Sequence, residues 1–115
     1  MADRYLLVVT RDLMLQSRVV AAARSGHLPV RTIAGPPAPP GAALALVDCN
    51  EPGPARLDAI SVLRRDHPAL RILAVCAHVD RARRAAALAA GADRCVTNSA
   101  LVGVVTRSVT APETA

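Results

Sequence analysis

Three apolar segments of strand length, each followed by a segment with helical spacing, constrain the fold more than any other feature. YLLVV (5–9), ALALVD (43–48) and RILAVCA (71–77) are almost continuously apolar, which is typical of strands buried on both faces of a sheet. Strands that alternate with helices through short connections form a parallel sheet with helices on both faces. The sequence therefore predicts an α/β domain.

The expected helices have recognisable start and stop signals. Asp12 can cap a helix with Leu15, Val19 and Ala23 on one face, and Gly26 ends it. Asp80 and Gly91 bound a second helix in the same way. Two further helices are expected from apolar residues at helical spacing, Leu57, Ile60 and Leu63 in one, ended by His67 and Pro68, and Leu101, Val104 and Val105 in the other.

Two weaker strands and one loop complete the pattern. LPVRTIAG (28–35) predicts a short strand, and its proline suits the edge of a sheet. RCVT (94–97) predicts another, which gives five strands in all. The segment GPPAPPGA (35–42) cannot be helical, because its four prolines remove hydrogen-bond donors and clash with a preceding helical turn.

Length and composition limit what the chain can be. Its 115 residues, 52% of them hydrophobic, suit one domain over 1–115, with the polar tail at about 111–115 expected to be disordered. One Tyr and no Phe or Trp argue against stacking on nucleic-acid bases. All fourteen basic residues are arginine, and the longest basic run is RARR (81–84), so the net charge of +5 is interpreted as a solvated surface.

Cysteine usage and hydropathy favour a cytoplasmic protein. The three cysteines contain no CxxC pair, so neither a disulfide framework nor a zinc site is expected. No apolar run reaches the length of a signal peptide or a membrane span, so we expect no membrane contact. No sequence motif of a hydrolase or a phosphate-binding loop is present, and we do not expect an enzyme.

Several polar side chains follow the predicted strands. In parallel sheets the functional site lies beyond the carboxyl ends of the strands. That edge is expected to hold Thr10, Arg11, Asp48, Cys76 and Asn98.

Three stretches resemble the receiver domains of bacterial response regulators, particularly those that precede LuxR/NarL-type DNA-binding domains. They are ALVDCNEPG (45–53), HPALRILAVCAH (67–78) and AALAAGADRCVTNSA (86–100), and the resemblance extends from Tyr5 to about Val109. It implies a flavodoxin-like (CheY-like) five-stranded parallel sheet of order 2-1-3-4-5. The helix usual between the second and third strands is replaced here by the proline-rich loop. The sheet beneath is therefore either partly exposed, as a contact patch, or closed over by that loop.

The resemblance assigns roles that the residues only partly fit. Asp48 matches the phosphoacceptor, whereas Thr10 and Arg11 stand where receivers carry the acidic pair that holds Mg²⁺, beside Asp12. Mg²⁺ binding is therefore expected to be weak or lost, and no other cofactor is implied. Cys76 stands at the position of the usual Ser or Thr, and Cys95 at that of the switch aromatic. Asn98 stands at the position of the usual lysine. Without these groups Asp48 should be a poor phosphoryl acceptor.

Two hypotheses concern individual side chains near this edge. Arg11 either pairs with Asp48 in place of the missing cations or extends into solvent. Cys76 and Cys95 either form a redox pair or are small buried hydrophobes, with Cys49 pointing away from Asp48. His27, His67 and His78 are expected at the surface.

The leading functional interpretation is an atypical stand-alone receiver that acts through protein contacts independently of phosphorylation. The alternatives are a phosphorylatable receiver served by a histidine kinase, and a ligand sensor that regulates transcription. By the resemblance, the last two helices and the fifth strand form the partner or homodimer face, with Arg81, Arg84, Ala85, Leu88, Val96, Leu101 and Val105. Direct nucleic-acid binding is not expected, because no helix-turn-helix follows.

Overall fold

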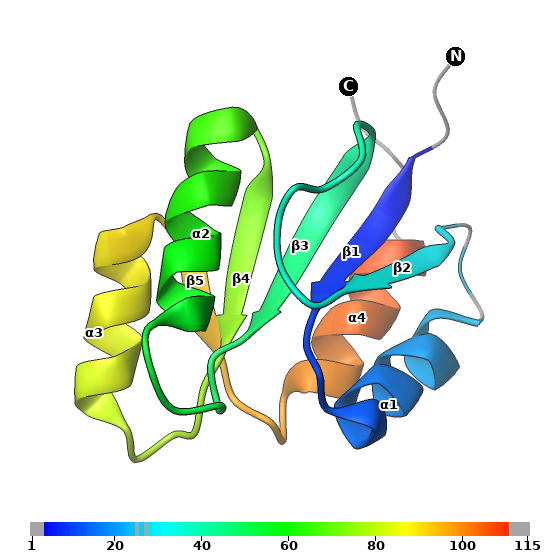
Figure 1. The fold of residues 1–115 in the computed structure, drawn as a ribbon. Helices are drawn as coiled ribbons and strands as arrows, with labels where there is room; N and C mark the ends of the chain where they lie inside the picture. Colours follow the sequence, from blue (N-terminus) through cyan, green and yellow to red (C-terminus); the bar gives the residue numbers. More distant parts are fainter. Residues whose placement is uncertain (1–3, 25, 27, 111–115) are drawn as a thin grey trace.

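The computed structural model describes residues 4–24, 26 and 28–110. Within them lie five strands and four helices (Figure 1). The strands are Tyr5–Val9 (β1), Val30–Ile33 (β2), Ala42–Asp48 (β3), Arg71–Val75 (β4) and Arg94–Val96 (β5). The helices are Leu13–Ala23 (α1), Ala55–Asp66 (α2), Arg81–Ala90 (α3) and Leu101–Thr110 (α4). The polar tail at 111–115 and His27 lie outside the described residues.

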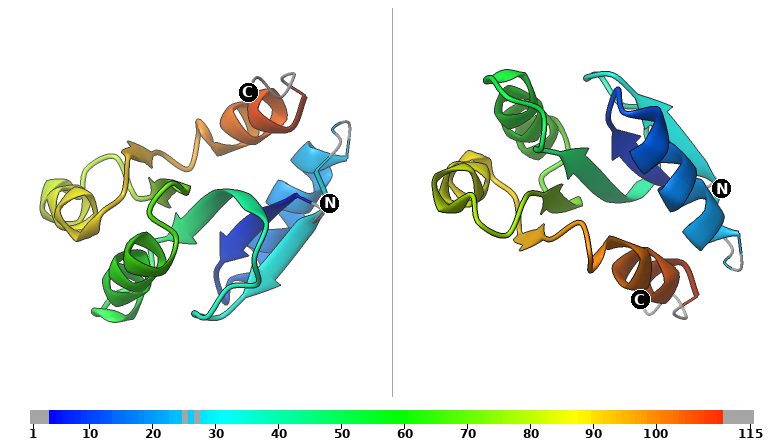
Figure 2. Two further views of the ribbon diagram at one scale, coloured as in Figure 1. Left: turned by 90° about the horizontal axis from the view of Figure 1, so that it is seen from above. Right: turned by 90° about the horizontal axis from the view of Figure 1, so that it is seen from below.

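The five strands form one parallel sheet in the order β2-β1-β3-β4-β5, which confirms the predicted topology. Figure 2 shows the sheet between two helical layers, with α1 and α4 on one face and α2 and α3 on the other. β2 and β5 are the edge strands, so the edge position that Pro29 predicts for β2 is confirmed; the strand itself begins only after this proline.

The helix signals identified in the sequence act as expected. The Asp12 carboxylate accepts hydrogen bonds from the backbone N–H groups of Met14 and Leu15, which caps α1. Asp80 caps α3 through the N–H of Arg83. Gly91 ends α3 with a φ of 125°, a left-handed conformation that favours glycine.

Gly26 has a different role from the helix stop that was predicted, because α1 already ends at Ala23. A Cβ atom at Gly26 would lie 2.3 Å from Cγ2 of Val109 in α4. The glycine therefore permits the turn after α1 to approach α4 closely.

Each face of the sheet packs against its own helical layer. Leu6 and Val8 of β1 contact the buried stripe of α1 and the buried residues of α4, which are Leu101, Val105 and Val109. Leu7 and Val9 point the other way, toward Ile60 and Leu63 of α2 and Ala87 of α3. This alternation within continuously apolar strands explains why the strands carry no alternating polar pattern in the sequence.

The proline-rich loop (35–42) covers the sheet between β2 and β3, where receiver domains usually have a helix. Tyr5, Leu7 and Val9 beneath it are at most 2% exposed, and Ala38 of the loop packs against the core cluster that contains them. The Tyr5 hydroxyl also donates a hydrogen bond to the carbonyl of Pro39. Of the two alternatives for this face, closure by the loop is therefore the one found.

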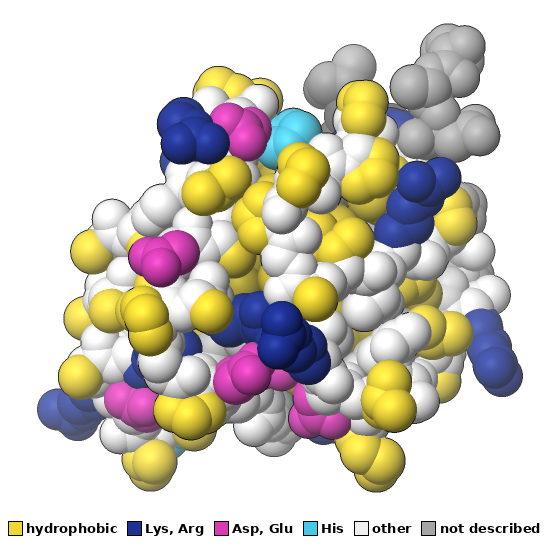
Figure 3. All heavy atoms as spheres, viewed as in Figure 1, with side chains coloured by type: hydrophobic (Ala, Val, Ile, Leu, Met, Phe, Trp, Pro, Cys, Tyr) yellow, Lys and Arg dark blue, Asp and Glu magenta, His cyan; other side chains and the backbone are white. Residues whose placement is uncertain are grey.

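A surface pocket of about 410 Å³ remains between this loop and α2, lined in part by Pro36, Pro37, Ala59 and Val62. Hydrophobic side chains gather in this region of the molecule (Figure 3). Separately, none of the described helices is long and apolar enough to cross a membrane.

Candidate functional site

The carboxyl ends of the strands bring the predicted site residues to one edge of the sheet. Thr10 follows β1, Asp48 ends β3, and Asn98 follows β5. A surface pocket of about 350 Å³ opens at this edge, and its lining consists of Arg11, Asp12, Asp48, Asn50 and Glu51. The pocket is where the sequence places the functional site of such a sheet.

Asp48 is buried, with 4% of its surface exposed, and both of its carboxylate oxygens accept hydrogen bonds. The Thr10 hydroxyl donates to Oδ2 at 2.8 Å, and the backbone N–H of Asn50 donates to Oδ1 at 3.1 Å. The oxygen of the same Thr10 hydroxyl accepts the N–H of Asp12 at 3.0 Å. A neutral network thus satisfies the carboxylate and connects it to the start of α1.

The proposed ion pair between Arg11 and Asp48 does not form. Arg11 is exposed and, among the described residues, has no carboxylate within 4.0 Å. The backbone turns after Thr10 so that the Arg11 side chain extends into solvent, which was the alternative considered from the sequence. The groups that hold Asp48 are Thr10 and Asn50.

The donor set around Asp48 fits Mg²⁺ poorly. The other two carboxylates of the pocket are engaged, because Asp12 caps α1 and Glu51 pairs with Arg56 at 2.7 Å. In the part of the chain that the structure describes, no three His, Cys, Asp or Glu side chains are grouped so that they could hold a metal ion. Mg²⁺ is usually held by carboxylate and water oxygens in an octahedron, and the side chain closest to Asp48 here is the neutral hydroxyl of Thr10.

Asn98, at the place of the receiver lysine, contacts other partners than Asp48. Its side-chain oxygen accepts a hydrogen bond from Nδ2 of Asn50 at 2.9 Å. Its backbone carbonyl accepts one from the Arg18 guanidinium of α1 at 3.0 Å. The residue joins the loops after β3 and β5 through neutral groups and brings no charge to the carboxylate.

Arg83 is a site residue that the sequence analysis missed. From the first turn of α3 its guanidinium donates to three backbone carbonyls of the loop after β3, those of Cys49, Glu51 and Gly53, at 2.9, 2.7 and 2.7 Å. Arg83 lies in the run RARR, which was interpreted as a solvated surface. The pattern gave no signal that one of its arginines turns inward.

The same loop is fixed from its other side by Arg56, which the sequence analysis also missed. Arg56 is buried and donates to the Ala34 carbonyl at 2.8 Å as well as to Glu51. The loop that begins at Asp48 is therefore held between α2 and α3 by two guanidinium groups. Each forms charge-assisted hydrogen bonds, which are stronger than neutral ones.

The three cysteines lie together on the face of the sheet that packs against α2 and α3. Cys49 and Cys76 are buried, and Cys95 is half-buried. Burial raises the pKa of Cys49 to about 11 and that of Cys76 to about 12. Buried thiols with raised pKa values stay protonated at neutral pH and react slowly, which favours the interpretation of these two as small core residues.

The predicted partner face is only partly at the surface. Arg81, Ala85 and Leu88 of α3 are exposed, and Arg84 is half-buried. Val96, Leu101 and Val105 are core residues, 4%, 0% and 0% exposed, because they pack against α1 and the sheet. Their place on the contact face is thus a wrong prediction. The remaining members of the face stay a prediction.

Comparisons with known proteins place the fold. No family model and no curated protein matches the chain. A CheY-like receiver domain protein of Methanospirillum hungatei is 15% identical, with a TM-score of 0.72 over 94% of each chain. A response regulator of Thermotoga maritima is 18% identical, with a TM-score of 0.72 over 94% of this chain and 95% of that one.

A third similar structure is a larger protein. The response regulator DrrB of Thermotoga maritima is 16% identical, with a TM-score of 0.73 over 92% of this chain and 52% of DrrB. At such low sequence identities the structural similarity shows the fold alone. It is consistent with the strand order β2-β1-β3-β4-β5. The chain has the CheY-like fold of response regulator receiver domains.

Proposed function

We propose that this chain is an atypical receiver domain that signals through protein contacts and does not depend on phosphorylation of Asp48. The observation that carries the proposal is the hydrogen bond from the Thr10 hydroxyl to Oδ2 of Asp48. A neutral donor thereby occupies one oxygen of the carboxylate, at the position where receivers present an acidic ligand for Mg²⁺. The second oxygen is held by the Asn50 N–H.

The chemistry of phosphoryl transfer supports this view. Transfer to an aspartate requires charge neutralisation at the equatorial oxygens, usually by a metal ion and a cationic side chain. Around Asp48 the pocket offers one cation, Arg11, and its side chain points into solvent. We therefore propose that Mg²⁺ binding is weak or lost and that the site has a structural role.

The partner, in this proposal, binds the surface formed by α3 and β5. Receiver domains are signalling modules and are generally not enzymes, and we propose the same for this chain. A protein partner and a second copy of the chain are the two occupants that such a surface suggests. A histidine kinase as partner, or a metabolite in the pocket of Arg11, Asp12 and Asn50, belongs to the alternatives that the experiment below separates.

The experiment is a proton–nitrogen NMR titration of the full chain with Mg²⁺ and beryllium fluoride, which together mimic a phosphorylated aspartate. We expect the amide signals around Asp48, Cys76 and Asn98 to stay in place at millimolar Mg²⁺. A receiver with an intact acidic pair, titrated in parallel, shows that the reagents are active.

Concerted shifts in the loop after β3 and in α3 would overturn the proposal, provided that the variant Asp48→Asn loses them. Such a result would identify a phosphorylatable receiver. Shifts that persist in Asp48→Asn would instead indicate ion binding elsewhere in the pocket and would direct the search toward a ligand sensor.

A further inference from the structure

Most of the net positive charge of the protein arises in the segment 81–110. The segment 81–110 contains five arginines and one acidic residue, Asp93, although the whole chain carries a net charge of only +5. This segment comprises α3, β5 and α4. Four of these arginines lie on α3 and β5, which are in contact at one edge of the sheet, whereas Arg107 lies on α4, which packs against α1 on the other face.

Internal contacts engage the acidic residue and one of the arginines. The Asp93 carboxylate accepts hydrogen bonds from Arg64 and from the N–H of Ile72, both at 2.8 Å, and these contacts hold its pKa below the usual value, with the Ile72 bond contributing most. Arg83 is occupied by the loop after β3. Asp93 is thus unavailable to neutralise the other arginines.

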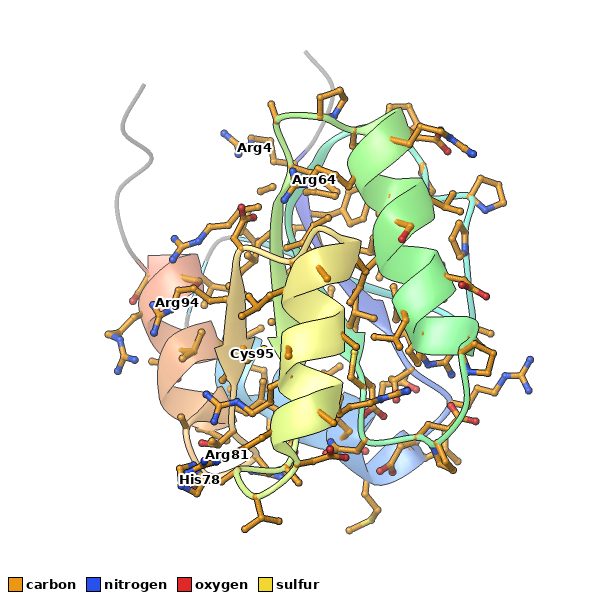
Figure 4. All side chains as sticks on the ribbon, turned by 90° about the vertical axis from the view of Figure 1, so that its left-hand side faces the viewer. Arg4, Arg64, His78, Arg81, Arg94 and Cys95 are labelled. Atoms are coloured by element: carbon orange, nitrogen blue, oxygen red, sulfur yellow. The ribbon has the colours of Figure 1, made fainter. Side chains whose placement is uncertain are left out.

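Three of the four remaining arginines belong to what we call the basic face, defined by Arg81, Arg84, Ala85, Leu88, Arg94 and Cys95, whereas Arg107 lies on α4. The four α3 members lie at positions i, i+3, i+4 and i+7, on one side of the helix. Arg81 and Arg94 are exposed, and within the described residues neither they nor Arg84 form an ion pair. Figure 4 shows Arg81, Arg94 and Cys95 on the same side of the molecule.

This charge pattern disfavours a second copy of the chain as the occupant. A two-fold dimer places the same patch against itself, so that the three arginines of one basic face would come close to the three arginines of the other. Like charges in contact oppose association and favour a partner of opposite charge. Leu88, 48% exposed among the arginines, adds an apolar contact that a purely electrostatic nucleic-acid surface does not need.

We propose that the basic face binds an acidic, amphipathic segment of a partner protein and not a second copy of the chain. The inference rests on the proposed function, because it names the class of partner for the same surface. Acidic side chains of the segment would pair with Arg81, Arg84 and Arg94, and an apolar side chain would cover Leu88 beside the free edge of β5.

The test uses the full chain and a designed helical peptide with Glu and Leu at i, i+4 spacing as the probe. Binding is followed by NMR and by isothermal titration calorimetry at low and high salt. We expect shifts confined to α3 and β5, and weaker binding at high salt. The variant Arg81→Gln/Arg94→Gln should weaken binding about tenfold, since each exposed charge pair contributes a factor of up to about five.

The matched control is Arg24→Gln/Arg65→Gln, which removes two exposed positive charges elsewhere and should leave the affinity within about twofold. Equal losses in both variants would overturn the inference, because attraction would then follow net charge alone. Tighter binding of a poly-uridine RNA than of the peptide at this face, or a dimer in light scattering that Arg81→Gln/Arg94→Gln dissociates, would also overturn it. Unchanged affinity of the same peptide for the variant Arg81→Gln/Arg94→Gln would overturn the inference as well.

Repeating the titration with Mg²⁺ and beryllium fluoride separates this inference from the proposed function. Peptide binding that is the same with and without these reagents supports both. Binding to the basic face that appears only in their presence retains the acidic partner but overturns independence from phosphorylation. The absence of binding in both conditions overturns the acidic partner and leaves the proposed function to its own test.

Discussion

At the residue scale, Thr10 links two features that the sequence presents separately. Its hydroxyl donates to the buried Asp48 carboxylate and its oxygen accepts the N–H of Asp12, the residue that caps α1. Replacement by valine keeps the shape but removes both hydrogen bonds. We expect Thr10→Val to lower the free energy of unfolding by about 1–3 kcal/mol, the cost of leaving a buried polar group unpaired. Urea denaturation measures this change.

Two variants serve as controls for Thr10→Val. Thr10→Ser keeps the hydroxyl and should lose less stability than the valine variant. Thr106→Val removes a hydroxyl that bonds only to the Val102 carbonyl on the surface of α4, and it should change stability by less than about 0.5 kcal/mol. Equal stability of Thr10→Val and the native chain would show that the Thr10 hydroxyl does not support the carboxylate.

At the element scale, Arg83 couples α3 to the loop that carries the site. Its guanidinium holds three carbonyls of that loop. Arg83→Ala should therefore lower the free energy of unfolding by about 1–2 kcal/mol, which is less than for fully buried charged hydrogen bonds because the group is partly solvated. It should also accelerate hydrogen exchange of the amides in residues 49–53, which mass spectrometry detects.

The neighbouring arginine provides the control. Arg81 is exposed and its side chain donates no hydrogen bond within the described residues, so Arg81→Ala should change stability by less than about 0.5 kcal/mol and leave exchange in the loop unaltered. Similar exchange in the two variants would mean that α3 and the loop are not coupled through Arg83.

The contact between the turn after α1 and helix α4 gives a second prediction at this scale. A Cβ at Gly26 would lie 2.3 Å from Cγ2 and 2.4 Å from Cβ of Val109, so Gly26→Ala must push α4 away. Overpacking of this kind costs about 1–3 kcal/mol, which thermal unfolding would record. Gly35→Ala is the control, since no atom lies within 4 Å of its Cβ position and no loss is expected.

At the scale of the whole molecule, apolar runs and cap residues are sufficient to predict the five strands, the four helices and their layers. These signals predict which residues lie at the carboxyl edge of the sheet, but they do not predict the direction in which a long side chain extends from it. For that reason the sequence leaves open whether Arg11 pairs with Asp48 or extends into solvent, and the structure shows an exposed Arg11 without the ion pair. Arg83 was assigned to solvent and turns inward, because three carbonyls far away in the chain become its partners only after folding.

The same limit explains the error at the partner face. Helical spacing groups Leu101 and Val105 on one side of α4, but it does not say whether that side meets a partner or the core. Both are fully buried against α1 and the sheet. The missing information is the packing of α4, to which the close approach at Gly26 contributes.

The stability of the whole molecule at alkaline pH is the last prediction. The chain has no lysine, so few groups titrate between pH 8 and pH 11. Burial raises the pKa of the Cys49 and Cys76 thiols from 9.0 to about 11 and about 12. Above pH 9 the unfolded chain therefore releases thiol protons that the folded chain retains. Linkage then requires the free energy of unfolding to fall as the pH rises from about 9 toward 11.

Each of the two thiols should contribute a slope that rises from about 0.7 kcal/mol per pH unit at pH 9 toward a limit of about 1.4. Tyr5, whose pKa burial also raises above 10.0, adds to the fall at its upper end. Urea denaturation at pH 7.5, 9 and 10 measures the slope. Cys49→Ala/Cys76→Ala should flatten the curve between pH 9 and 10. A native chain whose stability is constant from pH 7.5 to 10 would contradict the burial of protonated thiols beneath α3.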